Sequence, residues 1–186
     1  MLRQLTTPRA AALAGVIFAL LFGAVLVLIR IKMPAGATGA SEWLGSRGSG
    51  IAAATKLMPF AGISFLWFIG VVRDGLGRYE DKFFSSVFLG SGLLFLAMMF
   101  VSTAVAAGLV ASNGGITDPA AREATAEFGK VVVLAASKTY AVRMAAVFMM
   151  SLATIWLRTA LMPKWLVALS YLMALVLMVA ADTTMW

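Results

Sequence analysis

The fold is decided by residues 83–111, which read FFSSVFLGSGLLFLAMMFVSTAVAAGLVA and contain no charged side chain. The hydrocarbon core of a bilayer is about 30 Å thick, so a helix needs about 20 mainly apolar residues to cross it. This run exceeds that length. The sequence therefore predicts a membrane-spanning helix over residues 83–111.

Four further apolar runs accompany this one in a chain of 186 residues, of which 62% are hydrophobic and 12% are charged. Soluble globular domains have about 45–50% apolar and about 25% charged residues, and the mean hydropathy here is +0.96. We therefore predict an all-α, polytopic transmembrane helical bundle of about five spans that forms one domain over residues 1–186. The predicted spans are 10–29, 51–72, 83–111, 131–157 and 165–181.

Residues at the ends of these runs predict where helices and loops begin. The first run has 20 residues, which is longer than the about 7–15 of a signal peptide, so we expect an uncleaved helix. Cleavage in the small-residue stretch 35–37 is the alternative. The glycine-rich stretch 33–50 predicts a loop. Asp118 followed by Pro119 predicts the start of a helix outside the membrane.

The run 83–111 also carries small residues on one helical face. Gly90, Ala97, Ala104 and Ala111 recur every seven residues, and Gly108 lies on the same face. Small residues let two helices approach closely in lipid, so this stripe predicts a helix-packing interface. The alternative is a chance register of an alanine-rich composition.

The fourth run carries a polar face. Arg143 lies about 7–8 Å inward from the membrane interface expected at Lys138. An arginine at this depth typically faces a bundle interior or an anionic group, which predicts contact with a lipid phosphate or another anion. The alternative is that the Arg143 side chain extends to the lipid headgroups, and that Thr139 and Thr154 donate hydrogen bonds to carbonyl groups of their own helix. The candidate contact residues are Lys138, Thr139, Arg143, Thr154 and Arg158.

Missing residue types exclude several kinds of chemistry. The chain has no His and no Cys, which argues against His-ligated haem, the common zinc and copper sites, and iron–sulfur clusters. We predict no metal site and no cofactor. The acidic pairs Glu80–Asp81 and Glu123/Glu127 have no histidine or cysteine partner, so we expect no enzyme activity.

The charge balance points to the membrane surface. The net charge is +7 and the isoelectric point is about 10.3, but the basic residues gather at the ends of the apolar runs, where anionic headgroups lie. We therefore expect membrane lipids as partners and no nucleic acid. Basic residues in the two shortest loops favour a cytoplasmic N-terminus.

The stretch from Pro59 to Asp74, PFAGISFLWFIGVVRD, continues through residues 80–84, EDKFF, to residues 90–92, GSG. In these segments the chain resembles uncharacterised multi-span membrane proteins of actinobacteria. The resemblance covers about a third of the chain and implies a multi-pass protein of a bacterial plasma membrane. It assigns no functional residue.

Together these features predict a non-catalytic integral membrane protein. We expect it to self-associate as a homo-oligomer or to serve as an accessory subunit of a larger membrane complex, with lipid or anion contact at Arg143. The alternative is an oligomeric channel or small carrier for anions or small solutes, lined by the polar face of the fourth run.

Overall fold

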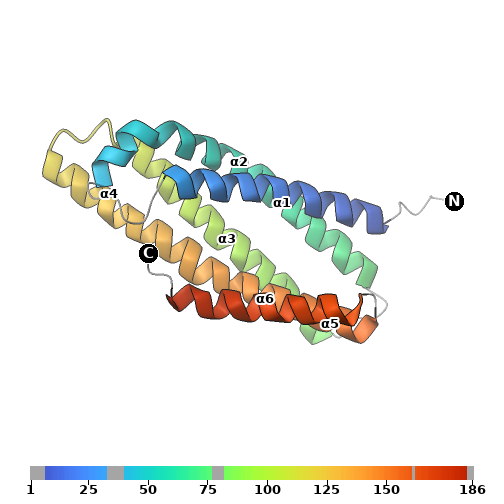
Figure 1. The fold of residues 1–186 in the computed structure, drawn as a ribbon. Coiled ribbons are helices and arrows are strands. Elements are labelled where there is room, and N and C mark those ends of the chain that lie inside the picture. The colour runs from blue at the N-terminus through green and yellow to red at the C-terminus, as the bar shows by residue number, and fades with distance from the viewer. Residues whose placement is uncertain (1–6, 33–39, 77–81, 161, 184–186) are drawn as a thin grey trace.

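The structure, a computed structural model, describes residues 7–32, 40–76, 82–160 and 162–183. All regular elements in these ranges are helices (Figure 1). They are α1 (Thr7–Lys32), α2 (Ala40–Leu76), α3 (Lys82–Ser112), α4 (Pro119–Leu134), the π-helix η1 (Ala135–Ala141), α5 (Val142–Thr159) and α6 (Lys164–Thr183).

The predicted all-α transmembrane bundle is confirmed. Four segments are long and apolar enough to cross a membrane, and the apolar part of α6 is shorter. With 20 residues, α6 as a whole is about 30 Å long, which equals the hydrocarbon thickness. The four longer segments are Ala12–Ile29, Gly48–Asp74, Phe83–Ser112 and Pro119–Thr159.

Two segments are longer than a bilayer requires. Helix α2 has 37 residues and Pro119–Thr159 has 41, or about 55 and about 60 Å, against about 40–45 Å for a bilayer with its headgroups. The start of α2, the end of α3 and α4 meet at one end of the bundle (Figure 1). They enclose a small core of their own, made of Ile51, Ala106, Leu109, Ala126 and Val133.

The predicted loop over residues 33–50 is wrong from Ala40 onward, because α2 already begins there. Glycine disfavours a helix by about 1 kcal/mol per residue, but tertiary packing can outweigh that cost. Here Gly48 lies against Val110, and Ile51 is completely buried. Helix α2 also continues through Pro59.

The helix start predicted at Asp118 is confirmed. The Asp118 carboxylate accepts hydrogen bonds from the backbone N–H groups of Ala120 at 3.3 Å and Ala121 at 3.1 Å. Pro119 occupies the first helical position, where its missing N–H costs nothing.

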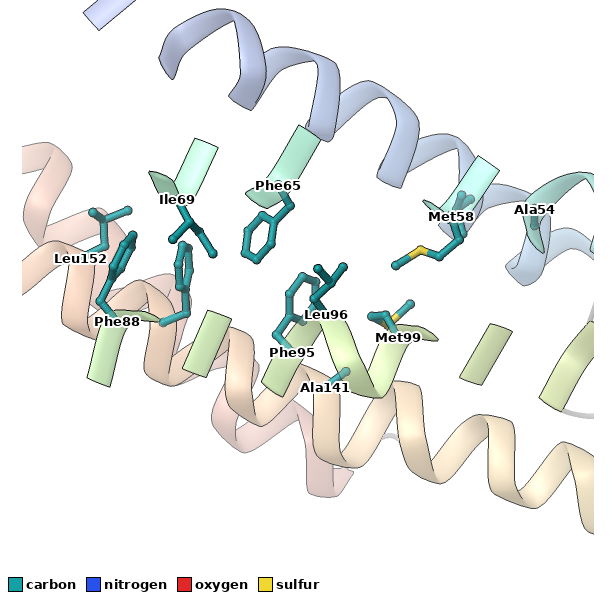
Figure 2. Packing of buried hydrophobic residues seen from close by; sticks show 12 residues of the cluster. Ala54, Met58, Phe65, Ile69, Phe88, Phe95, Leu96, Met99, Ala141 and Leu152 are labelled. Carbon is teal, nitrogen blue, oxygen red and sulfur yellow. The ribbon is translucent and has the colours of Figure 1, made fainter. Parts of the chain in front are cut away.

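Helix α3 lies at the centre of the bundle and packs on α2, α4, η1 and α5. Phenyl rings dominate the core between these helices (Figure 2). The Phe65 ring of α2 lies 5.4 Å from Phe95 of α3 and 5.3 Å from Phe148 of α5, centroid to centroid. Phe148 also stacks on Phe88 at 4.6 Å. These contacts join three helices through one aromatic cluster.

Glycines without room for a side chain lie beside this cluster. A Cβ at Gly92 of α3 would come within 2.8 Å of Ile69 and 3.0 Å of Phe148. A Cβ at Gly62 of α2 would come within 2.5 Å of Phe100. Gly70 of the same helix, by contrast, faces open space. Gly129 of α4 is equally tight against Leu109 of α3, where a Cβ would come within 2.5 Å, so close glycine contacts occur in both cores.

We predict that Gly92→Leu lowers the free energy of unfolding by about 1–3 kcal/mol, the usual cost of overpacking. The ring of Phe148 cannot move aside easily because it stacks on Phe88. Thermal unfolding in detergent measures the effect. Gly70→Leu, at an exposed helical glycine, is the control and should be neutral or stabilising. Equal loss in both variants would contradict this role of Gly92.

Candidate functional site

A cavity of about 540 Å³ is lined by residues of α1, α2, α3, α4, η1 and α5, and by Leu177 of α6. Helix α1 packs on α2, helix α6 packs on α5 and touches η1, and within the described residues the backbones of α1 and α6 do not meet. Figure 1 shows the two helices along opposite edges of the bundle, with α3 between them. The lining residues are Phe18, Phe22, Leu26, Ile29, Phe65, Phe95, Met99, Val133, Leu134, Ser137, Lys138, Val142, Ala145, Phe148, Met149 and Leu177.

The cavity has two chemically different ends. Phe65 and Phe148 lie at one end, where Phe65 also contacts Phe18 with ring centroids 4.7 Å apart. Ser137 and Lys138 lie ten or more residues earlier on the α4–η1–α5 helix, about 15 Å along its axis from Phe148. The rest of the lining is apolar. The cavity therefore combines a long apolar wall with one cationic position.

The cationic end is built by the π-helix η1, Ala135–Ala141. A π-turn replaces i→i+4 hydrogen bonds by i→i+5 bonds and is often found at functional sites. Just before it, the Val133 carbonyl accepts hydrogen bonds from Ser102 of α3 at 3.2 Å and from Ser137 at 2.6 Å. Two hydroxyl groups thus satisfy the backbone where the helical pattern changes.

The predicted contact residues lie in different surroundings. Lys138 lines the cavity, whereas Thr139 and Arg143 are half-buried and lie off its lining. The Thr154 hydroxyl lies 2.6 Å from the Tyr171 hydroxyl of α6. The Arg158 guanidinium lies 4.6 Å from the centre of the Phe84 ring of α3. The structure does not bring these five residues together.

The predicted small-residue stripe faces away from the bundle. Ala97, Ala104, Gly108 and Ala111 are exposed, and a Cβ at Gly90 or Gly108 would meet no atom within 4 Å. The stripe therefore makes no close helix contact within the described part of the chain. A contact with another chain stays a prediction.

Charged groups elsewhere form no metal site. Among the residues that the structure describes, no three Asp, Glu, His or Cys side chains are grouped to hold an ion. Lys130 of α4 is buried and lies 3.8 Å from Glu127, whose side chain is exposed. Neither residue lines the cavity.

The comparisons with known proteins give no assignment. No family model matches the chain, and neither the curated proteins nor the solved structures provide a match. The cavity and its lining therefore carry the functional argument.

Sequence reasoning missed most of the cavity. Its phenyl rings come from four separate helices and look like ordinary membrane-facing residues in the sequence. Ser102 had a detectable signal, because a serine in the middle of an apolar run usually needs a hydrogen-bond partner. The π-helix contains neither proline nor glycine and left no such signal.

We predict that Ser102→Ala lowers the free energy of unfolding by about 0.6 to 1.7 kcal/mol, the range for interhelical hydrogen bonds in membranes. The matched control is Ser64→Ala, because Ser64 bonds only the Phe60 carbonyl of its own helix. Thermal unfolding in detergent compares the two. Equal stability of both variants would show that the bond to Val133 adds nothing.

Proposed function

We propose that this protein is a non-catalytic membrane protein that binds a lipid chain in the cavity between α1 and α6. The observation that carries the proposal is the cavity itself, about 540 Å³ with an almost completely apolar lining. This volume falls within the about 300–1,000 Å³ of small-molecule sites. The backbones of α1 and α6 do not meet within the described residues, and a chain is proposed to enter between them from the hydrocarbon layer.

The volume of the cavity limits which molecule can occupy it. A transmembrane helix is about 30 Å long and about 10 Å across, so it displaces roughly 2,000 Å³ or more. The cavity of about 540 Å³ is far smaller. One narrow apolar chain fits such a space, whereas a helix of another subunit does not.

The lining favours lipid over an aqueous path. Channels place rings of carbonyl or charged groups along the pore, and apolar constrictions expel water. Leu26, Phe95 and Met149 are typical of the walls here. The apolar lining therefore supports a lipid-binding protein better than an oligomeric channel or carrier for anions.

Self-association is the second part of the proposal. The small stripe on α3 is accompanied by Leu94 and Val101, which are 52% and 44% exposed. Alternating small and branched residues on one helical face suit packing against another copy. The proposal also includes a lipid contact at Arg143. It places the protein in a bacterial plasma membrane with a cytoplasmic N-terminus.

We predict that Ala145→Phe removes a lipid that the purified protein retains, because the ring would fill the cavity. Native mass spectrometry in a mild detergent measures the bound mass. Ala168→Phe is the matched control, since Ala168 is exposed on α6. Met149→Trp narrows the same wall and should act like Ala145→Phe.

Thermal unfolding of the same samples separates lost binding from lost folding. If the native protein and its three variants are all folded and retain equal amounts of lipid, the cavity is not the binding site. Loss of lipid in the two cavity variants alone, with the control unchanged, is the expected result.

We predict that Ala104→Leu weakens self-association by about 1–3 kcal/mol, because the larger side chain separates the two backbones. The fold should tolerate it, since Ala104 is exposed. Cross-linking and sizing in detergent report the oligomer, with Ala168→Leu on α6 as the control. An unchanged oligomer would contradict the α3 interface.

A further inference from the structure

We infer that the cavity selects an amphiphile with one apolar chain and an anionic headgroup, a carboxylate or a phosphate, held at Lys138. The inference rests on the proposed chain-binding function and adds the chemistry of the headgroup. Its basis is the lining of the cavity, which is apolar except for Ser137 and Lys138.

The position of Lys138 agrees with the depth of a headgroup. Counting back from Leu157, the last apolar residue before Arg158, 20 residues end at Lys138, a length of about 30 Å. This equals the hydrocarbon thickness, which places Lys138 at the level where headgroups begin. From there the cavity runs inward toward Phe65 and Phe148. A bound amphiphile would therefore lie in the same direction as a lipid of the surrounding layer.

The charged residue in the cavity lining is a cation. Among the described residues that line the cavity there is no Asp or Glu, and Lys138 is the charged one. Lys138 also interacts within the chain, but an ammonium group carries three donors. Three donors allow one ammonium group to hold a headgroup oxygen alongside another partner. The Ser137 hydroxyl already donates to Val133, so it adds an acceptor rather than a donor.

The π-helix places the lysine at this point of the wall. Ala136 and Ala141 of η1 are buried, and η1 packs on α3. Lys138, between them in sequence, faces the cavity. The element that meets the central helix thus also presents the cation to the cavity.

The test compares headgroups on a single chain length. Delipidated protein in nonionic detergent is titrated with palmitate, hexadecyl phosphate, hexadecanol and hexadecylamine, with displacement of a fluorescent fatty acid as the readout. Charge-assisted hydrogen bonds are stronger than neutral ones by an amount that corresponds to about tenfold in affinity. We expect palmitate and hexadecyl phosphate to bind about tenfold more tightly than hexadecanol, and hexadecylamine most weakly.

Three variants assign the preference to one side chain. Lys138→Met should remove the preference by lowering palmitate affinity to about that of hexadecanol, and Lys138→Arg should keep the preference. Lys164→Met removes an exposed lysine at the start of α6 and should change nothing. Native mass spectra of protein taken directly from membranes then identify the source, a free fatty acid or a two-chain anionic phospholipid.

The outcomes separate this inference from the proposed function. Equal affinity of the native protein for palmitate and hexadecanol, with both lost in Ala145→Phe, would overturn the headgroup inference and leave chain binding intact. A headgroup preference that survives in Lys138→Met would also overturn it. No binding of any chain, in a protein that unfolds cooperatively, would overturn the proposed function itself.

Discussion

The whole bundle depends on close packing between α2, α3 and α5, because apolar side chains gain no hydrophobic free energy when they move from lipid into the protein. In water the hydrophobic effect would drive these helices together, whereas in a bilayer dispersion contacts, interhelical hydrogen bonds and lipid entropy do so. Phe65, Phe88 and Phe148 supply that contact area, and Gly92 allows the rings to come close. The hydrogen bond from Ser102 to Val133 adds a polar contact that lipid cannot replace.

The cavity follows from this arrangement. Because α3 occupies the centre, the first and last helices attach to different partners, α1 to α2 and α6 to α5. Within the described residues the backbones of α1 and α6 do not meet. Phe18 and Phe22 of α1 reach the core only by their side chains. The result is a partly open apolar space with Lys138 in its lining.

Features set by residues that are close in sequence can be predicted from it, whereas features set by contacts between distant residues cannot. Apolar length and the Asp118–Pro119 cap are local properties, so the helical bundle and the start of α4 were predicted correctly. The helix over residues 40–50 was missed because its glycines are outweighed by packing on Val110 and around Ile51. The polar face of the fourth run was projected with 3.6 residues per turn. The π-helix at Ala135–Ala141 changes that spacing at Thr139. Thr154 and Arg158 lie in the regular helix α5, and their neighbours Tyr171 and Phe84 come from α6 and α3, which the sequence of one helix does not show.

The central claim is that the cavity is an apolar lipid site rather than a wet path, and a single cysteine at Ala145 tests it most directly. The native chain has no cysteine, and a thiol in apolar surroundings stays uncharged and unreactive. A charged, water-soluble methanethiosulfonate reagent should therefore modify Gly115→Cys, in the exposed turn before α4, and leave Ala145→Cys unmodified in intact membranes. Modification of Ala145→Cys as fast as that of Gly115→Cys would contradict the account.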